Sequence, residues 1–272
     1  MEAEQGVIVR LKQVEHRYGH GQPVLCRTEL SVRRGEFVSV IGPSGAGKTT
    51  LMRVLNGAVH ISGGQVELFG VRFDSLRGKR KRQVQKRVGT IYQDFCLVDY
   101  STCLQNVLNG CLADMPLFRV LFGWFTREQR ERAMEALKAV GLEEKAWSRA
   151  GHLSGEQKQR VAIARALMQE PELLLADEPV ASLDPASGRQ VLDLLKKLQK
   201  ERGITVIMNS HSLSAAMEYS ERIIGMREGA ILFDVPAREA GRDLMDRLYG
   251  TGGDSEAEDK REYKAGGRHE ES

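Results

Sequence analysis

The chain has 272 residues, of which 41% are hydrophobic and 28% are charged. This composition is typical of a globular protein with a sizeable core, and it excludes disorder of the whole chain. The formal net charge of +3 is too small to indicate a nucleic-acid partner, because a domain that neutralises many phosphates carries a stronger basic excess. We therefore expect one large domain with a tail and no nucleic-acid partner.

The cysteines and the apolar stretches suggest a cytoplasmic protein. Cys26, Cys96, Cys103 and Cys111 form no Cys-x-x-Cys pair, so we expect reduced thiols and neither a disulfide nor a metal cluster. The N-terminal segment has no basic region followed by a long apolar stretch, so no secretory signal is expected. The most apolar stretch, residues 116–125, is far shorter than the ~20 residues that a membrane helix needs.

The first third of the chain reads as strands around one helix. Residues 7–11 alternate between apolar and polar side chains, which predicts a half-buried strand. The apolar run at 37–41 leads into a glycine-rich loop and then into the segment LMRVLNG, a pattern typical of a buried strand, a loop and a helix. Two short strands are expected within residues 65–73, and another at 88–92.

The remainder predicts a helical insertion followed by a return to alternating strands and helices. The pattern is helical from 104 to 142, so a helical subdomain is expected at about 100–165. Apolar runs at 173–176 and 205–208 flank an amphipathic helix, which implies a mostly parallel sheet covered by helices. Residues 251–272 lack apolar periodicity and are predicted to form a disordered tail.

The glycine-rich loop matches the phosphate-binding pattern G-x-x-x-x-G-K-[ST]. Its glycines allow backbone N–H groups to converge on phosphate oxygens, and the following helix directs its positive end at the same anion. Lys48 is predicted to reach the β- and γ-phosphates and the Thr49 hydroxyl to ligate Mg²⁺. The motif alone does not separate kinases, GTPases, helicases and transport ATPases. The nucleotide-binding residues predicted here are Gly42, Pro43, Ser44, Gly45, Ala46, Gly47, Lys48, Thr49 and Thr50.

Two acidic residues, Asp177 and Glu178, follow the apolar run at 173–176. They are placed at the carboxyl end of a buried strand, which is where ligands bind in open α/β sheets. Asp177 is predicted to hold Mg²⁺ through its water shell, and Glu178 to orient and deprotonate an attacking water as general base. A solvated surface pair is the weaker alternative.

The segment LSGEQKQR at 153–160 resembles the signature motif of ABC (ATP-binding cassette) ATPases, which no other phosphate-loop class carries. Ser154 is expected to cap the following helix, with Gln157 as its capping-box partner. An ordinary helix start would compete with this interpretation if the motif stood alone. Further motifs resemble the same family in the same order over nearly all of residues 6–250, so the chain is identified as a member of it.

The resemblance implies one ABC ATPase domain at 6–250 with the phosphate-loop NTPase fold, namely a mostly parallel core sheet, an N-terminal antiparallel β region and a helical subdomain. It implies ATP and Mg²⁺ as cofactors. It also implies that Tyr18 stacks on adenine, that Gln93 senses Mg²⁺ and the water, and that His211 contacts the γ-phosphate. Taken singly, Tyr18 and His211 are equally well explained as core residues, and Gln93 as a polar loop residue.

The sites implied by the resemblance fall into three groups. The expected catalytic residues are Glu178, His211 and Gln93. The expected metal-binding residues are Thr49, Gln93 and Asp177. The residues expected to contact nucleotide in addition to the loop are Tyr18, Ser154, Gly155, Glu156, Gln157 and Asp184, the last within a D-loop at 182–184.

Members of this family pair head to tail, so the resemblance also implies a homodimer. Ser154 and Gly155 would then face the ATP that is held by Lys48 of the partner subunit. One departure from the family pattern is Glu156, which stands where glycine is usual. We hypothesise that its charge, near the γ-phosphate of the other site, slows ATP-driven closure modestly.

Three stretches, at 95–102, 123–157 and 173–195, resemble the ATPases of bacterial phosphonate importers. This likeness implies a peripheral protein on the cytoplasmic face of the cell membrane that couples ATP hydrolysis to phosphonate uptake. Its implied partners are integral membrane permease subunits and an extracytoplasmic phosphonate-binding protein. The alternatives are importers of phosphite, phosphate or another small solute, lipoprotein-releasing machinery, a non-transport ABC ATPase and a phosphate-loop kinase.

Two surface features have two interpretations each. An apolar cluster follows the predicted glutamine loop, and it either docks a cytoplasmic helix of the permease or forms core of the subdomain. The basic run at 77–87 is either a contact with anionic lipid or a solvated face. The members of the apolar cluster are Phe118, Leu121, Phe122, Trp124 and Phe125.

Overall fold

The computed structural model describes residues 6–19 and 21–250, and the tail predicted at 251–272 lies outside the described residues. One sheet has four strands in the order β2-β1-β4-β5, all paired antiparallel, as expected for the N-terminal region. Strand β1 extends well past residue 11, and the second of the strands expected within 65–73 stops at residue 72. The strands are β1 (Val7–Arg17), β2 (Pro23–Arg33), β4 (Gly63–Leu68) and β5 (Val71–Arg72).

The second sheet is the predicted, mostly parallel core. Its six strands have the order β10-β9-β3-β8-β7-β6, and only the β9–β10 pair is antiparallel. The sequence reading missed β9 and β10, as it missed β2. The strands are β3 (Phe37–Ile41), β6 (Val88–Ile91), β7 (Leu173–Asp177), β8 (Thr205–Asn209), β9 (Arg222–Arg227) and β10 (Ala230–Pro236).

Strand β3 lies in the middle of the core sheet and all five of its residues are buried. Its side chains alternate between the two faces of the sheet. Val38 and Val40 pack into the cluster that joins the core sheet to the antiparallel sheet and α1 (Lys48–Leu55), whereas Phe37 packs into the cluster beneath the helices. Burial on both faces explains why this strand is an unbroken apolar run.

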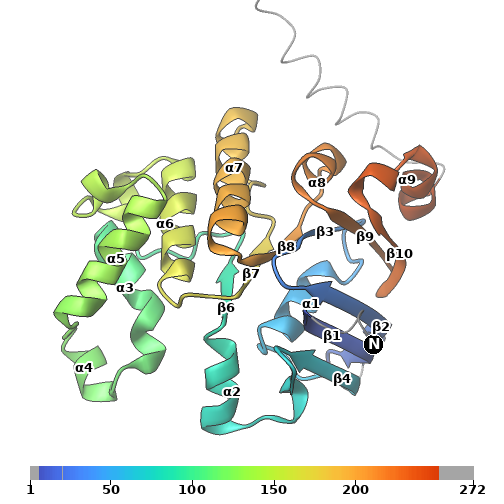
Figure 1. Ribbon diagram of the computed structural model, residues 1–272, viewed down its shortest axis with the longest axis horizontal. Helices are drawn as coiled ribbons and strands as arrows, with labels where there is room; N and C mark the ends of the chain where they lie inside the picture. The colour runs from blue at the N-terminus through green and yellow to red at the C-terminus, as the bar shows by residue number, and fades with distance from the viewer. Residues whose placement is uncertain (1–5, 20, 251–272) are drawn as a thin grey trace, which may run out of the picture.

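Helices cover the core sheet. The stripe predicted between 173–176 and 205–208 forms α7 (Pro185–Arg202), in which Val191, Leu194, Leu195 and Leu198 are all buried. In Figure 1, α7 stands between the core sheet and a group of helices at the left. The other helices along the core are α2 (Gly78–Gln85), α8 (Leu213–Tyr219) and α9 (Arg242–Tyr249).

The helical region at the left of Figure 1 is built from α3 (Cys103–Leu108), α5 (Arg127–Ala139) and α6 (Gly155–Leu167), which pack on one another. The helical pattern at 104–142 is thus not one element. Its break has local causes, because Gly123 adopts φ +62° and Thr126 caps α5 through a capping box.

The short helix α4 (Leu117–Leu121) lies in this break and has no buried residue. Leu121 and Phe122 are 74% and 68% exposed, and Phe118 and Trp124 are exposed as well. Only Phe125 of the predicted apolar cluster packs against the core. The core interpretation therefore holds for Phe125 and fails for the rest of the cluster. Within the described residues, every helix is too short or too polar to cross a bilayer.

Candidate active site

The phosphate loop joins β3 to α1 and is packed tightly against two other strands. Gly42 and Gly47 have φ values of +152° and +99°. A Cβ atom on Gly42 would lie 2.1 Å from the Met226 carbonyl oxygen, and one on Gly47 would lie 2.7 Å from the Val24 carbonyl oxygen. Glycine is required at both positions for the backbone conformation and for the close approach to β9 and β2.

The turn between β9 and β10 also contacts the loop. Gly229 donates its N–H to the Ala46 carbonyl at 3.1 Å, and its own carbonyl accepts the Cys26 N–H at 2.8 Å. A chain of backbone hydrogen bonds thus links the loop to β2 through Gly229. Neither contact follows from the phosphate-loop motif, because both partners come from distant segments.

Lys48 is the first residue of α1, and only 5% of its surface is exposed. Its Nζ donates to the carbonyl oxygens of Gly42 at 2.6 Å and Pro43 at 3.1 Å. Burial lowers the pKa of Lys48 below its ordinary value, while the charges of Glu178 and Asp177 counter part of that shift. The Lys48 amine is therefore held in place by the carbonyl groups of the loop.

The carboxylate of Asp177, at the end of β7, accepts two hydrogen bonds. The Thr49 hydroxyl donates to its Oδ1 at 3.3 Å, and Asn209 Nδ2 donates to the same oxygen at 2.6 Å. Asn209 ends β8, is fully buried and pairs with Asp177 across the sheet. Sequence reasoning missed Asn209, although a polar residue that ends an apolar strand beside a predicted site was a usable signal.

Glu178 and His211 form a hydrogen-bonded pair, with Oε1 and Nε2 separated by 2.6 Å. Glu178 has φ +51°, which is uncommon for a side chain other than glycine, and its N–H donates to the Asn209 carbonyl. Its side chain is 17% exposed and that of His211 is 48% exposed. His211 is therefore not a core histidine, and the acidic pair is not a solvated surface pair.

Tyr18 and Gln93 both border solvent. Tyr18 is 45% exposed, its hydroxyl lies 3.4 Å from Thr50 Oγ1, and its ring meets His16 edge-on at 4.5 Å between centroids. The core explanation for Tyr18 is thus wrong. Gln93 is exposed beyond the end of β6, which neighbours β7 in the sheet.

The signature segment begins α6 as predicted. Ser154 and Gln157 form a capping box, in which each side chain bonds the backbone N–H of the other. The carboxylate of Glu156 is paired with Arg160 at 2.7 Å. A Cβ on Gly155 would lie 3.1 Å from Leu183, so this segment lies beside the predicted D-loop.

Asp184, in the predicted D-loop, caps α7. Its Oδ1 accepts the N–H groups of Ala186 and Ser187, each at 3.1 Å. A hydrogen bond from the Ser187 side chain, together with these backbone hydrogen bonds, lowers the pKa of the Asp184 carboxyl group below its ordinary value. The signature helix α6 lies apart from α1 in Figure 1, so one chain does not bring the signature and the phosphate loop together.

A glycine loop between a buried strand and a helix, with a lysine inside it and two acids at a neighbouring strand end, defines the class of phosphate-loop nucleotide-binding proteins. Comparison with known families narrows this class. The model of the family described as ABC transporter matches residues 25–181. The chain therefore belongs to the ABC transporter family, and it is an ATPase of that family.

Relatives match this chain over almost their whole length. The phosphonates import ATP-binding protein PhnC of Shouchella clausii is 44% identical over 89% of this chain and 91% of its own length. The protein of the same name from Lactobacillus gasseri is 42% identical over 95% of this chain and 99% of its own length.

Two solved structures share the fold. The ATP-binding cassette MJ0796, a dimer in a post-hydrolysis state bound to ADP and Pi, is 34% identical with a TM-score of 0.74, covering 85% of this chain and 99% of its own. The cbiO1 protein from Clostridium perfringens, part of the ABC transporter complex cbiONQ, is 28% identical with a TM-score of 0.78, covering 90% of this chain and 95% of its own.

The packing of the loop yields a stability prediction. Gly47→Ala and Gly45→Ala both place a side chain at positive φ, which costs about 1–2 kcal/mol. An added Cβ on Gly45 meets nothing within 4 Å, whereas that on Gly47 meets the Val24 carbonyl. We expect Gly47→Ala to lower the free energy of unfolding by a further ~1–3 kcal/mol, measured by urea denaturation without nucleotide. Equal losses in the two variants would contradict the packing of the loop on β2.

Proposed function

We propose that this chain is the ATPase subunit of a phosphonate importer and couples ATP binding and hydrolysis to phosphonate uptake across the cytoplasmic membrane. The proposal that the chain hydrolyses ATP is supported above all by the Glu178–His211 pair. This pair lies at the edge of the sheet where Lys48 and Asp177 lie. The phosphonate part is supported by the names of relatives that match nearly the whole chain.

The phosphate loop would bind the nucleotide phosphates through its backbone N–H groups and the positive end of α1. Lys48 needs no long movement for this task, because the Gly42 and Pro43 carbonyls already hold its amine inside the loop. An ammonium group has three donors, so one remains for a phosphate oxygen beside these two bonds. Tyr18, exposed and anchored near Thr50, is the proposed adenine platform.

The residues beside the loop fit a magnesium ion. The Thr49 hydroxyl and the Asp177 carboxylate offer oxygen atoms 3.3 Å apart, and oxygen is the ligand type that Mg²⁺ prefers. Asn209 would hold the Asp177 carboxylate in position, and Gln93 is the proposed third contributor. When bound, Mg²⁺ neutralises charge that develops on the phosphates.

Glu178 is the proposed general base for the attacking water. As a carboxylate it is only an acceptor, so Nε2 of His211 carries the proton of their hydrogen bond. This bond fixes one carboxylate oxygen and leaves the other to accept a proton from water. A hydrogen bond from His211 to the γ-phosphate then requires either the opening of this pair or a second proton on Nδ1, because Nδ1 of the neutral ring is only an acceptor.

A second copy of the chain would complete each site. Ser154 and Gly155 begin α6, which lies apart from α1 in the same chain. A head-to-tail homodimer would place them against the nucleotide of the other subunit, in agreement with the dimeric relative bound to ADP and Pi.

The exposed apolar residues around α4 are the proposed docking site for a cytoplasmic helix of the permease. An apolar patch on a surface helix marks interaction sites, and Phe122 and Trp124 already stack with ring centroids 5.4 Å apart. The chain would thereby be held as a peripheral protein on the cytoplasmic face of the membrane. An extracytoplasmic binding protein would deliver the phosphonate to the permease.

Replacement of the proposed base tests the function. Glu178→Gln keeps the size of the side chain and removes its basicity, so we expect ATP hydrolysis to fall by about 10²–10⁴ while ATP affinity is kept. Cells that carry this variant should fail to grow on methylphosphonate as the only phosphorus source and should grow normally on inorganic phosphate. Normal growth on methylphosphonate, with no second uptake system present, would refute the substrate class; dependence on phosphite instead would favour that alternative.

The docking proposal is tested at two phenylalanines with different burial. Phe122→Asp changes an exposed side chain, so we expect stability within about 0.5 kcal/mol of the parent and loss of co-purification with the permease. Phe125→Asp introduces a charge at a partly buried position and should lower stability instead. Normal permease binding by the stable Phe122→Asp protein would show that α4 is not the docking site.

The Glu156 hypothesis also has a test. Since Arg160 neutralises much of the charge on Glu156, its effect on dimer closure should be small. We expect Glu156→Gly to raise the ATPase rate by no more than about fivefold, since an ion pair between residues four apart on a helix surface is worth ~1 kcal/mol or less. If Glu156→Gly leaves both ATPase activity and ATP-dependent dimerisation unchanged, Glu156 does not slow closure.

A further inference from the structure

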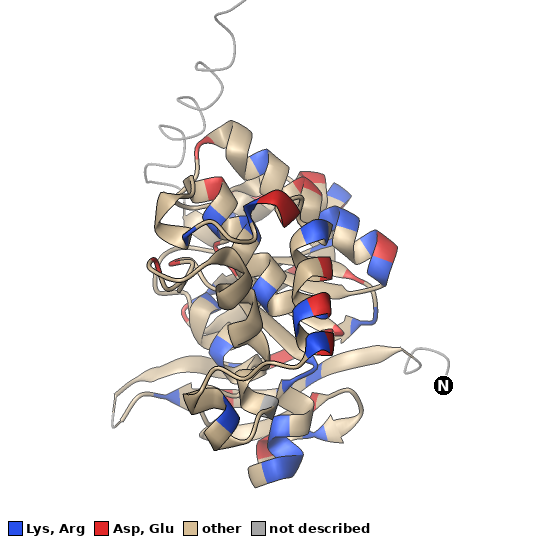
Figure 2. Ribbon diagram, turned by 90° about the vertical axis from the view of Figure 1, so that its left-hand side faces the viewer, with Lys and Arg blue, Asp and Glu red and all other residues tan. Residues whose placement is uncertain are grey.

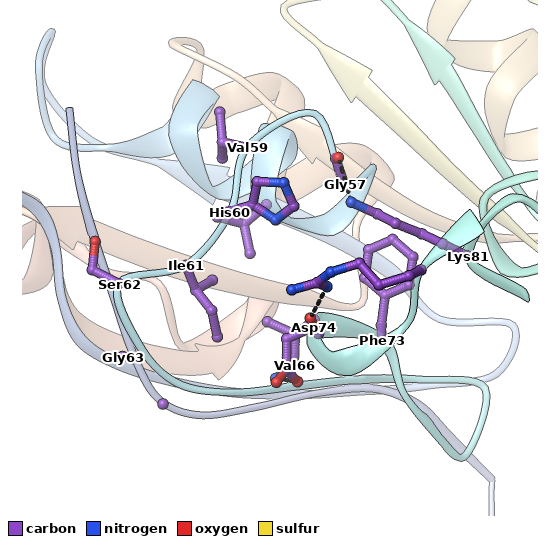
Figure 3. Close-up of a pocket in the computed structure, with 13 residues that line it drawn as sticks. Gly57, Val59, His60, Ile61, Ser62, Gly63, Val66, Phe73, Asp74 and Lys81 are labelled. Carbon is purple, nitrogen blue, oxygen red and sulfur yellow. Dashed lines mark hydrogen bonds between the residues drawn. The ribbon is translucent and has the colours of Figure 1, made fainter. Parts of the chain in front are cut away.

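A cavity of about 370 Å³ lies at the end of α1 that is opposite the phosphate loop. Figure 3 shows the segment from Val59 to Gly63 on one side of the cavity, and Phe73 with Lys81, which bonds the Gly57 carbonyl, on the other. Strand β4 contributes Val66 to its floor. None of the residues predicted for nucleotide binding or catalysis lines it.

Two cations face this cavity with donors to spare. Lys81 Nζ donates to the Gly57 carbonyl at 3.1 Å and lies 5.4 Å from the centroid of the Phe73 ring. Two of its three N–H groups have no acceptor among the described residues. Arg77 donates from Nη1 alone, to the carbonyls of Asp74 at 3.0 Å and Leu76 at 2.9 Å. Its Nε and Nη2 groups likewise have no described acceptor.

The two cations lack a carboxylate between them. Burial lowers the pKa of Lys81 below its ordinary value, and the nearby charge of Arg77 lowers it further. Asp74 is the one acidic residue among the described residues that line the cavity. Its Oδ1 accepts the Val66 N–H at 2.9 Å and its Oδ2 lies 3.3 Å from Arg72 Nε, so its charge is already engaged. An anion that bridged Lys81 and Arg77 would relieve their repulsion and take up their free donors.

The rest of the lining would suit the apolar part of a ligand. Val59, Ile61, Val66 and Phe73 all face the cavity. Its volume is at the lower end of the range of about 300–1,000 Å³ that small-molecule sites occupy. We propose that this cavity binds a small organic anion, with a phosphonate or phosphate monoester head group bridging Arg77 and Lys81 and a short apolar part against Phe73 and Ile61.

The chain offers matched controls for this site. Lys79 and Arg80 lie on the same helix, α2, and are exposed, whereas Lys81 is partly buried. Figure 2 shows this helix as the strongly basic element at the lower end of the molecule. Replacing Lys79 or Arg80 with glutamine changes the net charge as much as replacing Arg77 or Lys81 does. Only the replacements of Arg77 and Lys81 remove a group that lines the cavity.

The test is calorimetric titration of the full-length protein with phenylphosphonate. A saturating non-hydrolysable ATP analogue with Mg²⁺ keeps the probe out of the phosphate loop. We expect one site per chain, weaker binding of benzenesulfonate, which carries a single charge, and weaker binding of inorganic phosphate, which lacks the apolar part. Arg77→Gln and Lys81→Gln should each weaken binding of phenylphosphonate about tenfold or more, while Lys79→Gln and Arg80→Gln should change it less than about twofold.

Three results would overturn the proposal. The first is no binding of phenylphosphonate at millimolar concentration. The second is an equal loss in all four glutamine variants, which would mean non-specific attraction to a basic helix. The third concerns Ile61→Trp, which fills the cavity without changing its charge and remains informative if Arg77→Gln or Lys81→Gln does not fold. Undiminished binding by Ile61→Trp would place the anion elsewhere.

Discussion

The contact on which the rest of the site depends is the approach of the phosphate loop to the backbone of two other strands. Gly42 and Gly47 leave no room for a Cβ atom, because carbonyl oxygens of β9 and β2 occupy that space. Gly229 closes the same contact with a hydrogen bond to Ala46. These contacts hold the loop to the neighbouring strands through backbone atoms and not through side chains.

Asp177 and Glu178, at the edge of the core sheet, are also held in position by a neighbouring strand. Asn209 binds Asp177 from the next strand, and its carbonyl accepts the N–H of Glu178. Asn209 at the end of β8 thus positions Asp177 through its side chain and Glu178, the residue after β7, through its backbone carbonyl. His211, two residues further on, engages the Glu178 carboxylate. The spacing of these groups follows from the register of two parallel strands.

The two ends of α1 have different electrostatic surroundings. At its start, the charge of Lys48 is balanced by carbonyl oxygens and by the field of Asp177 and Glu178. At its far end, Lys81 and Arg77 have carbonyl partners but no carboxylate between them. Lys81 is partly buried and Arg77 is exposed, and two neighbouring cations repel each other unless a ligand compensates for their charge. This imbalance distinguishes the cavity at the far end of α1 from an ordinary void.

The sequence by itself determined the class of the fold, the positions along the chain of the core strands up to β8 and the residues of the phosphate loop, because each depends on local patterns. It also predicted the Ser154 cap, which spans only three residues. It did not predict β9 and β10, the role of Asn209, or the exposure of α4. These features depend on which distant segments pair in the sheet and on which apolar faces are left without a partner. Side chains far apart in the sequence share a site only once the sheet has set their spacing. Only the tertiary structure therefore decided these features.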